Sequence, residues 1–193
     1  MKARFHLFAS LLTLAVAVAL LTATAAAAPL NSNTGTVQFN ATLNEQLTVT
    51  VTAGATVNFT LAPNTANNAG STTSTVTTAW VLGSGRTNVA VWAYFSSATA
   101  ALNPTTVGNT VTIPSSAIGV QVNGAGPFNT CTAVSPFNAA ASGVLIGNTA
   151  ITGTNANSKR TDTLAYNINT TVVPQLPADT YTGVLNIQAQ ATP

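Results

Sequence analysis

Ionisable side chains are scarce in this 193-residue chain, and their scarcity excludes several classes of enzyme and metal site. The chain has one histidine, His6, and one cysteine, Cys131. His6 lies in a predicted leader, so the rest of the chain has no imidazole for a Ser-His-Asp or Cys-His arrangement. Most zinc, copper and non-haem iron sites need imidazole or several thiolates. We therefore expect no catalytic residue, no metal ion and no cofactor.

Acidic residues are equally few, and they number three: Glu45, Asp162 and Asp179. A glycosidase needs two carboxylates that face each other across a sugar, and a calcium site needs several clustered oxygen ligands. The three acids are far apart in the sequence, and each is interpreted as a solvated turn residue. A hydrolase is therefore the least favoured of the function classes, and we predict that the protein is not an enzyme.

Residues 1–27 have the pattern of a cleaved signal peptide. Lys2 and Arg4 precede an apolar run from Leu7 to Leu21, and small Ala and Thr residues follow it. This order of charge, short apolar helix and small residues is typical of secretory signals. A spanning helix needs about 20 apolar residues, so we predict no transmembrane segment once the signal is removed. The protein is then exported, to the cell surface or the extracellular medium.

Net positive charge is also absent once the leader is removed. The chain has five Lys and Arg residues against three Asp and Glu residues, and Lys2 and Arg4 belong to the leader. Three basic side chains therefore balance three acidic ones. Proteins that bind nucleic acid neutralise phosphates with clusters of Lys and Arg. We expect no nucleic-acid partner.

The chain is rich instead in β-branched and apolar residues that alternate with Thr, Asn and Ser. Alternation with a period of two predicts strands with one face inward and one toward water. Outside the signal, no long stretch has the 3.6-residue period of a helix. Residues 28–193 are therefore predicted to form one all-β domain, a two-sheet immunoglobulin-like β-sandwich of about 8–10 strands. The strands are expected at 37–43, 47–52, 57–61, 75–82, 87–96, 110–113, 118–122, 130–134, 144–146, 164–171 and 181–190.

Two segments resemble a known family. Residues 176–187, with the sequence LPADTYTGVLNI, are similar to the ending of many exported bacterial β-sandwich subunits. Residues 35–43, with the sequence GTVQFNATL, resemble the first strand of those domains, which include spore-coat-protein-U-like proteins and chaperone–usher pilins. The resemblance implies an immunoglobulin-like subunit of a surface filament or coat that assembles by strand exchange.

The candidate assembly strand lies within the segment 35–43. Val37, Phe39, Ala41 and Leu43 alternate with polar residues, and the segment has no charge and no proline. Soluble monomers usually guard exposed strand edges with Lys, Pro or bulges. We therefore expect self-association, or association with related subunits, when this strand is added to a neighbour's sheet. The alternative is that the strand pairs within its own sandwich.

Aromatic residues supply the second candidate site. Trp92 and Tyr94 are two residues apart, so they share one face of a predicted strand and would form an exposed platform. The alternative is that they belong to the core, as we expect for Trp80. Cys131 is expected to be a buried thiol, and an intermolecular disulfide is its alternative.

The leading hypothesis is thus a structural subunit of a pilus, fimbria or coat. The alternative function is a secreted carbohydrate-binding module with polysaccharide as its partner.

Overall fold

A computed structural model describes residues 28–131, 137 and 143–193. The predicted signal peptide lies outside the described residues. The chain divides into two compact units, Met1–Ala41 and Thr42–Pro193. In the first unit, residues 28–41 are exposed and form neither helix nor strand.

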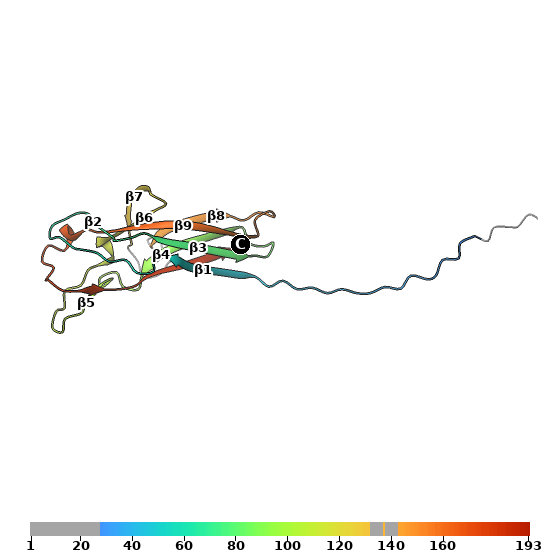
Figure 1. Ribbon diagram of the computed structural model, residues 1–193, viewed down its shortest axis with the longest axis horizontal. Coiled ribbons are helices and arrows are strands. Elements are labelled where there is room, and N and C mark those ends of the chain that lie inside the picture. The colour runs from blue at the N-terminus through green and yellow to red at the C-terminus, as the bar shows by residue number, and fades with distance from the viewer. Residues whose placement is uncertain (1–27, 132–136, 138–142) are drawn as a thin grey trace, which may run out of the picture. The chain divides into compact units, whose positions relative to one another are not determined.

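The second unit is an antiparallel β-sandwich (Figure 1). The larger sheet has the order β1-β3-β9-β6-β7, and short β2 pairs with β9 beyond the end of β3. Its strands are β1 (Gln46–Ala53), β2 (Asn68–Ala69), β3 (Ser74–Val81), β6 (Ile118–Val122), β7 (Ala125–Thr130) and β9 (Asn157–Ile168).

The smaller sheet has the order β11-β4-β8 and packs on the first. Its strands are β4 (Asn88–Phe95), β8 (Val144–Ala150) and β11 (Leu185–Thr192). A separate two-stranded pair joins β5 (Asn103–Pro104) to β10 (Tyr181–Thr182), and the short 3₁₀ helices are η1 (Ser115–Ala117) and η2 (Thr170–Val172). The predicted all-β sandwich is confirmed. Within the described residues, no helix is long and apolar enough to cross a membrane.

Strict alternation along β3, β4 and β9 explains why these sequences form a sandwich. In β4, every second residue from Val89 to Phe95 is buried, while the residues between them are half-buried. Val76 and Trp80 of β3 face the same core, as do Leu164, Tyr166 and Ile168 of β9. Each fully buried aliphatic or aromatic side chain contributes roughly 1.5–3 kcal/mol, so the core between the two sheets is the main source of stability.

Several predicted strands differ in the structure. Residues 37–43 are extended but unpaired, and residues 57–61 make only the isolated bridge from Phe59 to Gly70. Residues 110–113 likewise make one bridge, from Leu102 to Ile113. The strand predicted at 164–171 begins earlier, at Asn157, and the one predicted at 181–190 is interrupted at Gly183. Most of the strand predicted at 130–134 lies outside the described residues.

Candidate functional site

An apolar groove opens between the edges of the two sheets. β1 is the last strand of the larger sheet and pairs only with β3, whereas β11 is the last strand of the smaller sheet and pairs only with β4. The groove has a volume of about 890 Å³. Phe95, Tyr166 and Ile168 of the core line it from inside. Its two walls include Val57, Phe59, Leu61, Leu176, Tyr181, Val184, Leu185 and Ile187.

The residues after β1 explain why the groove stays open. β1 ends at Ala53, and Gly54 follows with φ +64°, which is a conformation that glycine adopts without strain. A side chain at Gly54 would collide with the carbonyl oxygen of Thr73. The next residues leave the β1–β3 ladder, and Phe59 makes an isolated bridge to Gly70, which precedes β3. The sheet therefore has no continuous edge strand beside the groove.

We call the boundary between the edge strands β1 and β11 the seam. The groove opens at one end of the seam, and polar contacts close the other end. β1 and β11 approach each other there. Arg86, in the turn between β3 and β4, binds Glu45 through Nε–Oε1 (3.2 Å) and Nη2–Oε2 (3.1 Å). Its Nη1 also donates to the carbonyl oxygen of Ala191 in β11 (3.5 Å). Hydrogen bonds from Arg86 and from the Gly83 N–H lower the pKa of Glu45. Glu45 is exposed, as expected for a solvated residue, and its carboxylate is bound to Arg86 and Gly83.

The candidate assembly strand is fully accessible in the structure. Val37 is 77 % exposed, Phe39 89 % and Leu43 78 %, although all three are large apolar side chains. Ala41 is exposed as well. Residues 37–43 form no strand in the described part of the chain, and pairing of this segment within its own sandwich stays a prediction. The segment is apolar and alternating.

The aromatic residues separate into a core residue and two surface residues. Trp80 is 3 % exposed, and its Nε1 donates to the carbonyl oxygen of Asn155 (2.8 Å). Trp92 and Tyr94 lie on the opposite face of β4 from its buried residues, and both are half-buried. The Tyr94 hydroxyl donates to Gln188 Oε1 across the β4–β11 pair (3.3 Å). The structure thus brings Trp92 and Tyr94 together on the outer face of the smaller sheet.

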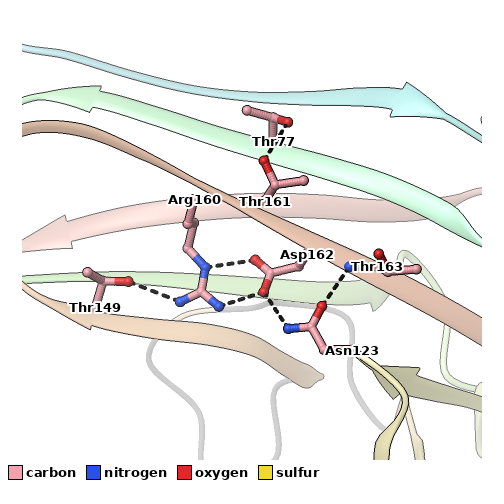
Figure 2. Close-up of polar contacts among 7 residues, drawn as sticks. All are labelled: Thr77, Asn123, Thr149, Arg160, Thr161, Asp162 and Thr163. Carbon is pink, nitrogen blue, oxygen red and sulfur yellow. Dashed lines mark hydrogen bonds and ion pairs between the residues drawn. The ribbon is translucent and has the colours of Figure 1, made fainter.

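Asp162 is not a solvated turn residue, which corrects its interpretation from the sequence. It lies in β9, faces the interior and is only 2 % exposed. Figure 2 shows Arg160 bound to it through Nε–Oδ2 (2.7 Å) and Nη2–Oδ1 (2.6 Å). Asn123, in the β6–β7 turn, donates to Oδ1 (3.0 Å), and Arg160 Nη1 reaches Thr149 of β8 (3.0 Å). The bond with Asp162 raises the pKa of Arg160. This cluster ties the two sheets together.

The sequence could have suggested this pair only in part. Arg160 and Asp162 are two residues apart, so on a strand they share a face. The turn signals before Asn157 led to the prediction that the strand begins later, which placed both residues in a loop. Gly147 of β8 makes room for the guanidinium, because a side chain there would collide with Arg160.

Asp179 holds two loops together. It accepts hydrogen bonds from the Nδ2 of Asn109 (2.7 Å), the hydroxyl of Thr106 (2.9 Å) and the N–H of Thr180 (2.7 Å). These bonds, that of Asn109 first, lower the pKa of Asp179 to about 2. Asp179 does lie in a turn, but it is a structural acceptor beside the β5–β10 pair.

Cys131 has no exposed surface, and burial raises the pKa of its thiol to about 11. A buried thiol that stays protonated is a poor nucleophile. The described residues contain no group of three or more His, Cys, Asp or Glu side chains close enough to hold a metal ion.

Comparisons with protein-family models, with curated proteins and with solved structures found no match for this chain. Function must therefore be inferred from the groove, the exposed segment and the aromatic surface.

Proposed function

We propose that the protein is a structural subunit of an extracellular or cell-surface assembly, in which residues 37–43 of one copy occupy the groove of the next. The observation that carries this proposal is the coexistence of an open apolar groove between two free sheet edges with an unpaired apolar segment in the same chain. Each is a liability for a monomer, since apolar side chains and unpaired edges are exposed. The segment could cover the apolar groove and pair with a free sheet edge, and the groove could bury the apolar side chains of the segment.

The chemistry of the two parts matches. A strand placed in the groove could hydrogen-bond to the free edge of β11, while its alternate side chains face inward. Val37, Phe39 and Leu43 have the spacing that would put all three on that inward face. Thr36, Gln38, Asn40 and Thr42 would then face water. The wall residue Val184 is 71 % exposed, so apolar surface is available in the groove.

Insertion into a second copy is favoured over insertion into the same copy by the direction of the chain. Only two residues, Asn44 and Glu45, separate Leu43 from Gln46, the first residue of β1. Gln46 pairs with Val81, and this end of β1 is the end that Glu45 and Arg86 close. The groove begins at the other end of β1, at Val51 and Gly54. A segment joined to the closed end would have to turn sharply at Asn44 and pass the closed part of the seam.

The test uses the mature protein, a variant that lacks residues 28–43, and a synthetic peptide of residues 35–45. We expect the mature protein to form concentration-dependent oligomers in size-exclusion chromatography with light scattering, and filaments or sheets in electron micrographs. The truncated variant should stay folded, not self-associate, and gain thermal stability when the peptide is added. A peptide with Phe39→Asp is the matched control and should have no effect.

A pair of valine substitutions tests the groove itself. Val184 lines the groove and Val107 does not, yet both side chains are exposed. Val184→Asp should prevent self-association because it places a carboxylate in the path of the inserted strand, whereas Val107→Asp should assemble normally. The proposal fails if the mature protein remains monomeric at high concentration and the truncated variant unfolds. That result would mean that residues 37–43 complete their own sandwich.

A further inference from the structure

The outer face of the smaller sheet has a composition unlike the groove. Residues directly opposite each other in an antiparallel pair share a face. Trp92 therefore shares its face with Gln188 of β11 and Leu145 of β8, and Tyr94 shares it with Asn186. We call this surface the amide–aromatic face. Its residues are Asn88, Ala90, Trp92, Tyr94, Leu145, Asn148, Asn186, Gln188 and Gln190.

Two aromatic rings of β4 lie on this face. Successive residues on one side of a strand are about 7 Å apart, so Trp92 and Tyr94 form a short row along β4. Both are half-buried, in contrast to the buried residues that alternate with them. In the described part of the chain the indole N–H of Trp92 has no hydrogen-bond partner, whereas that of the core residue Trp80 is bonded to Asn155. The Trp92 ring thus offers an apolar surface and a free donor.

Amides surround the rings, and the face has no charged residue. Asn and Gln side chains each carry two donors and one acceptor oxygen, which match the hydroxyl pairs of a sugar. The flat apolar side of a pyranose packs on an aromatic ring, and aromatic anchors bury large area at low cost in conformational entropy. A phosphate or carboxylate ligand would need Lys or Arg beside it, and none faces this surface. Leu145 is its only exposed large aliphatic side chain, at 44 %.

We propose that the amide–aromatic face binds a neutral polysaccharide, with Trp92 and Tyr94 stacking on sugar rings and Gln188 bonding to hydroxyls. The Tyr94–Gln188 hydrogen bond orients the amide beside the ring. This site is separate from the assembly groove. Trp92, Tyr94 and Gln188 do not line the groove, while Leu185 and Ile187, which alternate with the outward residues of β11, do.

Affinity electrophoresis of the mature protein in gels that contain soluble starch, mixed-linkage β-glucan, galactomannan or xylan tests the proposal. Binding to insoluble polymers is measured by the loss of protein from solution when cellulose or chitin is added. We expect at least one of these neutral polymers to bind. Trp92→Ala and Tyr94→Ala should each weaken that binding about tenfold or more, the loss typical of a central aromatic anchor. Tyr94→Phe keeps the ring and should retain most of the affinity.

Controls separate this site from folding and from assembly. Thr77→Ala, on the outer face of the larger sheet, should bind as the wild type does. Gln188→Ala should weaken binding without lowering the melting temperature. Val184→Asp should still bind polysaccharide even though it no longer assembles, so the two proposals can fail separately. Absence of binding to every neutral polymer, or unchanged binding by folded Trp92→Ala, would overturn the inference. Stronger binding to polygalacturonate than to any neutral polymer would also overturn it.

Discussion

Replacing Asp162 with asparagine keeps the shape of the side chain and removes the charge that binds Arg160. In the wild type, the carboxylate accepts two hydrogen bonds from the guanidinium and one from Asn123. Asparagine offers one acceptor oxygen and turns an N–H₂ group toward at least one donor, the Nε of Arg160 in one orientation of the amide. Arg160 would then lie between the sheets with Thr149 as its main partner. We expect the substitution to destabilise the fold strongly.

The magnitude follows from how deeply each partner is buried. Removing one member of a buried ion pair typically costs 3–5 kcal/mol, because an uncompensated charge remains in the interior. The side chain of Asp162 is 2 % exposed but that of Arg160 is 23 % exposed, so water can partly solvate the remaining cation. We therefore expect the lower end of that range, about 3 kcal/mol. With a urea m-value of about 2 kcal/mol/M, the midpoint of unfolding would fall by about 1.5 M.

Urea denaturation followed by tryptophan fluorescence measures this shift, and an exposed ion pair supplies the control. Glu45→Gln breaks the Arg86–Glu45 pair, whose side chains are 37 % and 44 % exposed, and should leave the midpoint close to that of the wild type. The double variant Arg160→Leu/Asp162→Leu should be more stable than Asp162→Asn, since apolar residues can replace a buried pair at little cost. A midpoint for Asp162→Asn equal to that of Glu45→Gln would refute the buried-pair argument.

Three further predictions concern single side chains. Trp80→Ala should lower the free energy of unfolding by about 3–5 kcal/mol, as for other buried aromatics, and Trp92→Ala should lower it much less; urea midpoints of the two variants test this. The buried hydroxyl of Thr78 has no partner in the described part of the chain, so Thr78→Val should raise the free energy of unfolding by about 1 kcal/mol, measured in the same way. The folded-state pKa of Asp179 is about 2, below its ordinary value of 3.8, so its contribution to stability is present above about pH 4 and is lost as pH falls toward 2. Thermal melts from pH 7 to pH 2 should therefore show a smaller acid decline for Asp179→Asn than for the wild type, and equal declines would contradict this role.

The strands that the sequence predicts well are those whose alternation the core enforces. The segments predicted at 75–82 and 87–96 match β3 and β4 within one residue at each end, because their inward residues meet a second sheet. The segment at 57–61 has the same alternation but only one bridge, since the turn at Gly54 takes the backbone away from β3. Periodicity reports that one face is buried and does not report which strand pairs with it.

Candidate sites that depend on local spacing could be predicted from the sequence, whereas those that depend on contacts between strands could not. The aromatic pair Trp92 and Tyr94 follows from spacing alone, since residues two apart on a strand must share a face. The partner of Asp162 also lies two residues away, yet its burial depends on Thr149 and Gly147 of a strand in the other sheet. The groove depends on which strands end each sheet, and that order is a property of the topology. Local sequence carries no direct signal for it.

The arrangement of charge along the seam bears on why it is open at one end only. β1 and β11, the edge strands beside the groove, contain no charged residue and no proline, although such residues are the usual protection of a sheet edge. Glu45 and Arg86, two of the six charged side chains in residues 28–193, close one end of the seam. At the other end Val51 and Val184 stay exposed. Among the described residues, an ion pair is present where β1 and β11 meet, and none is present where the two strands separate. That difference supports a groove kept available for an apolar strand.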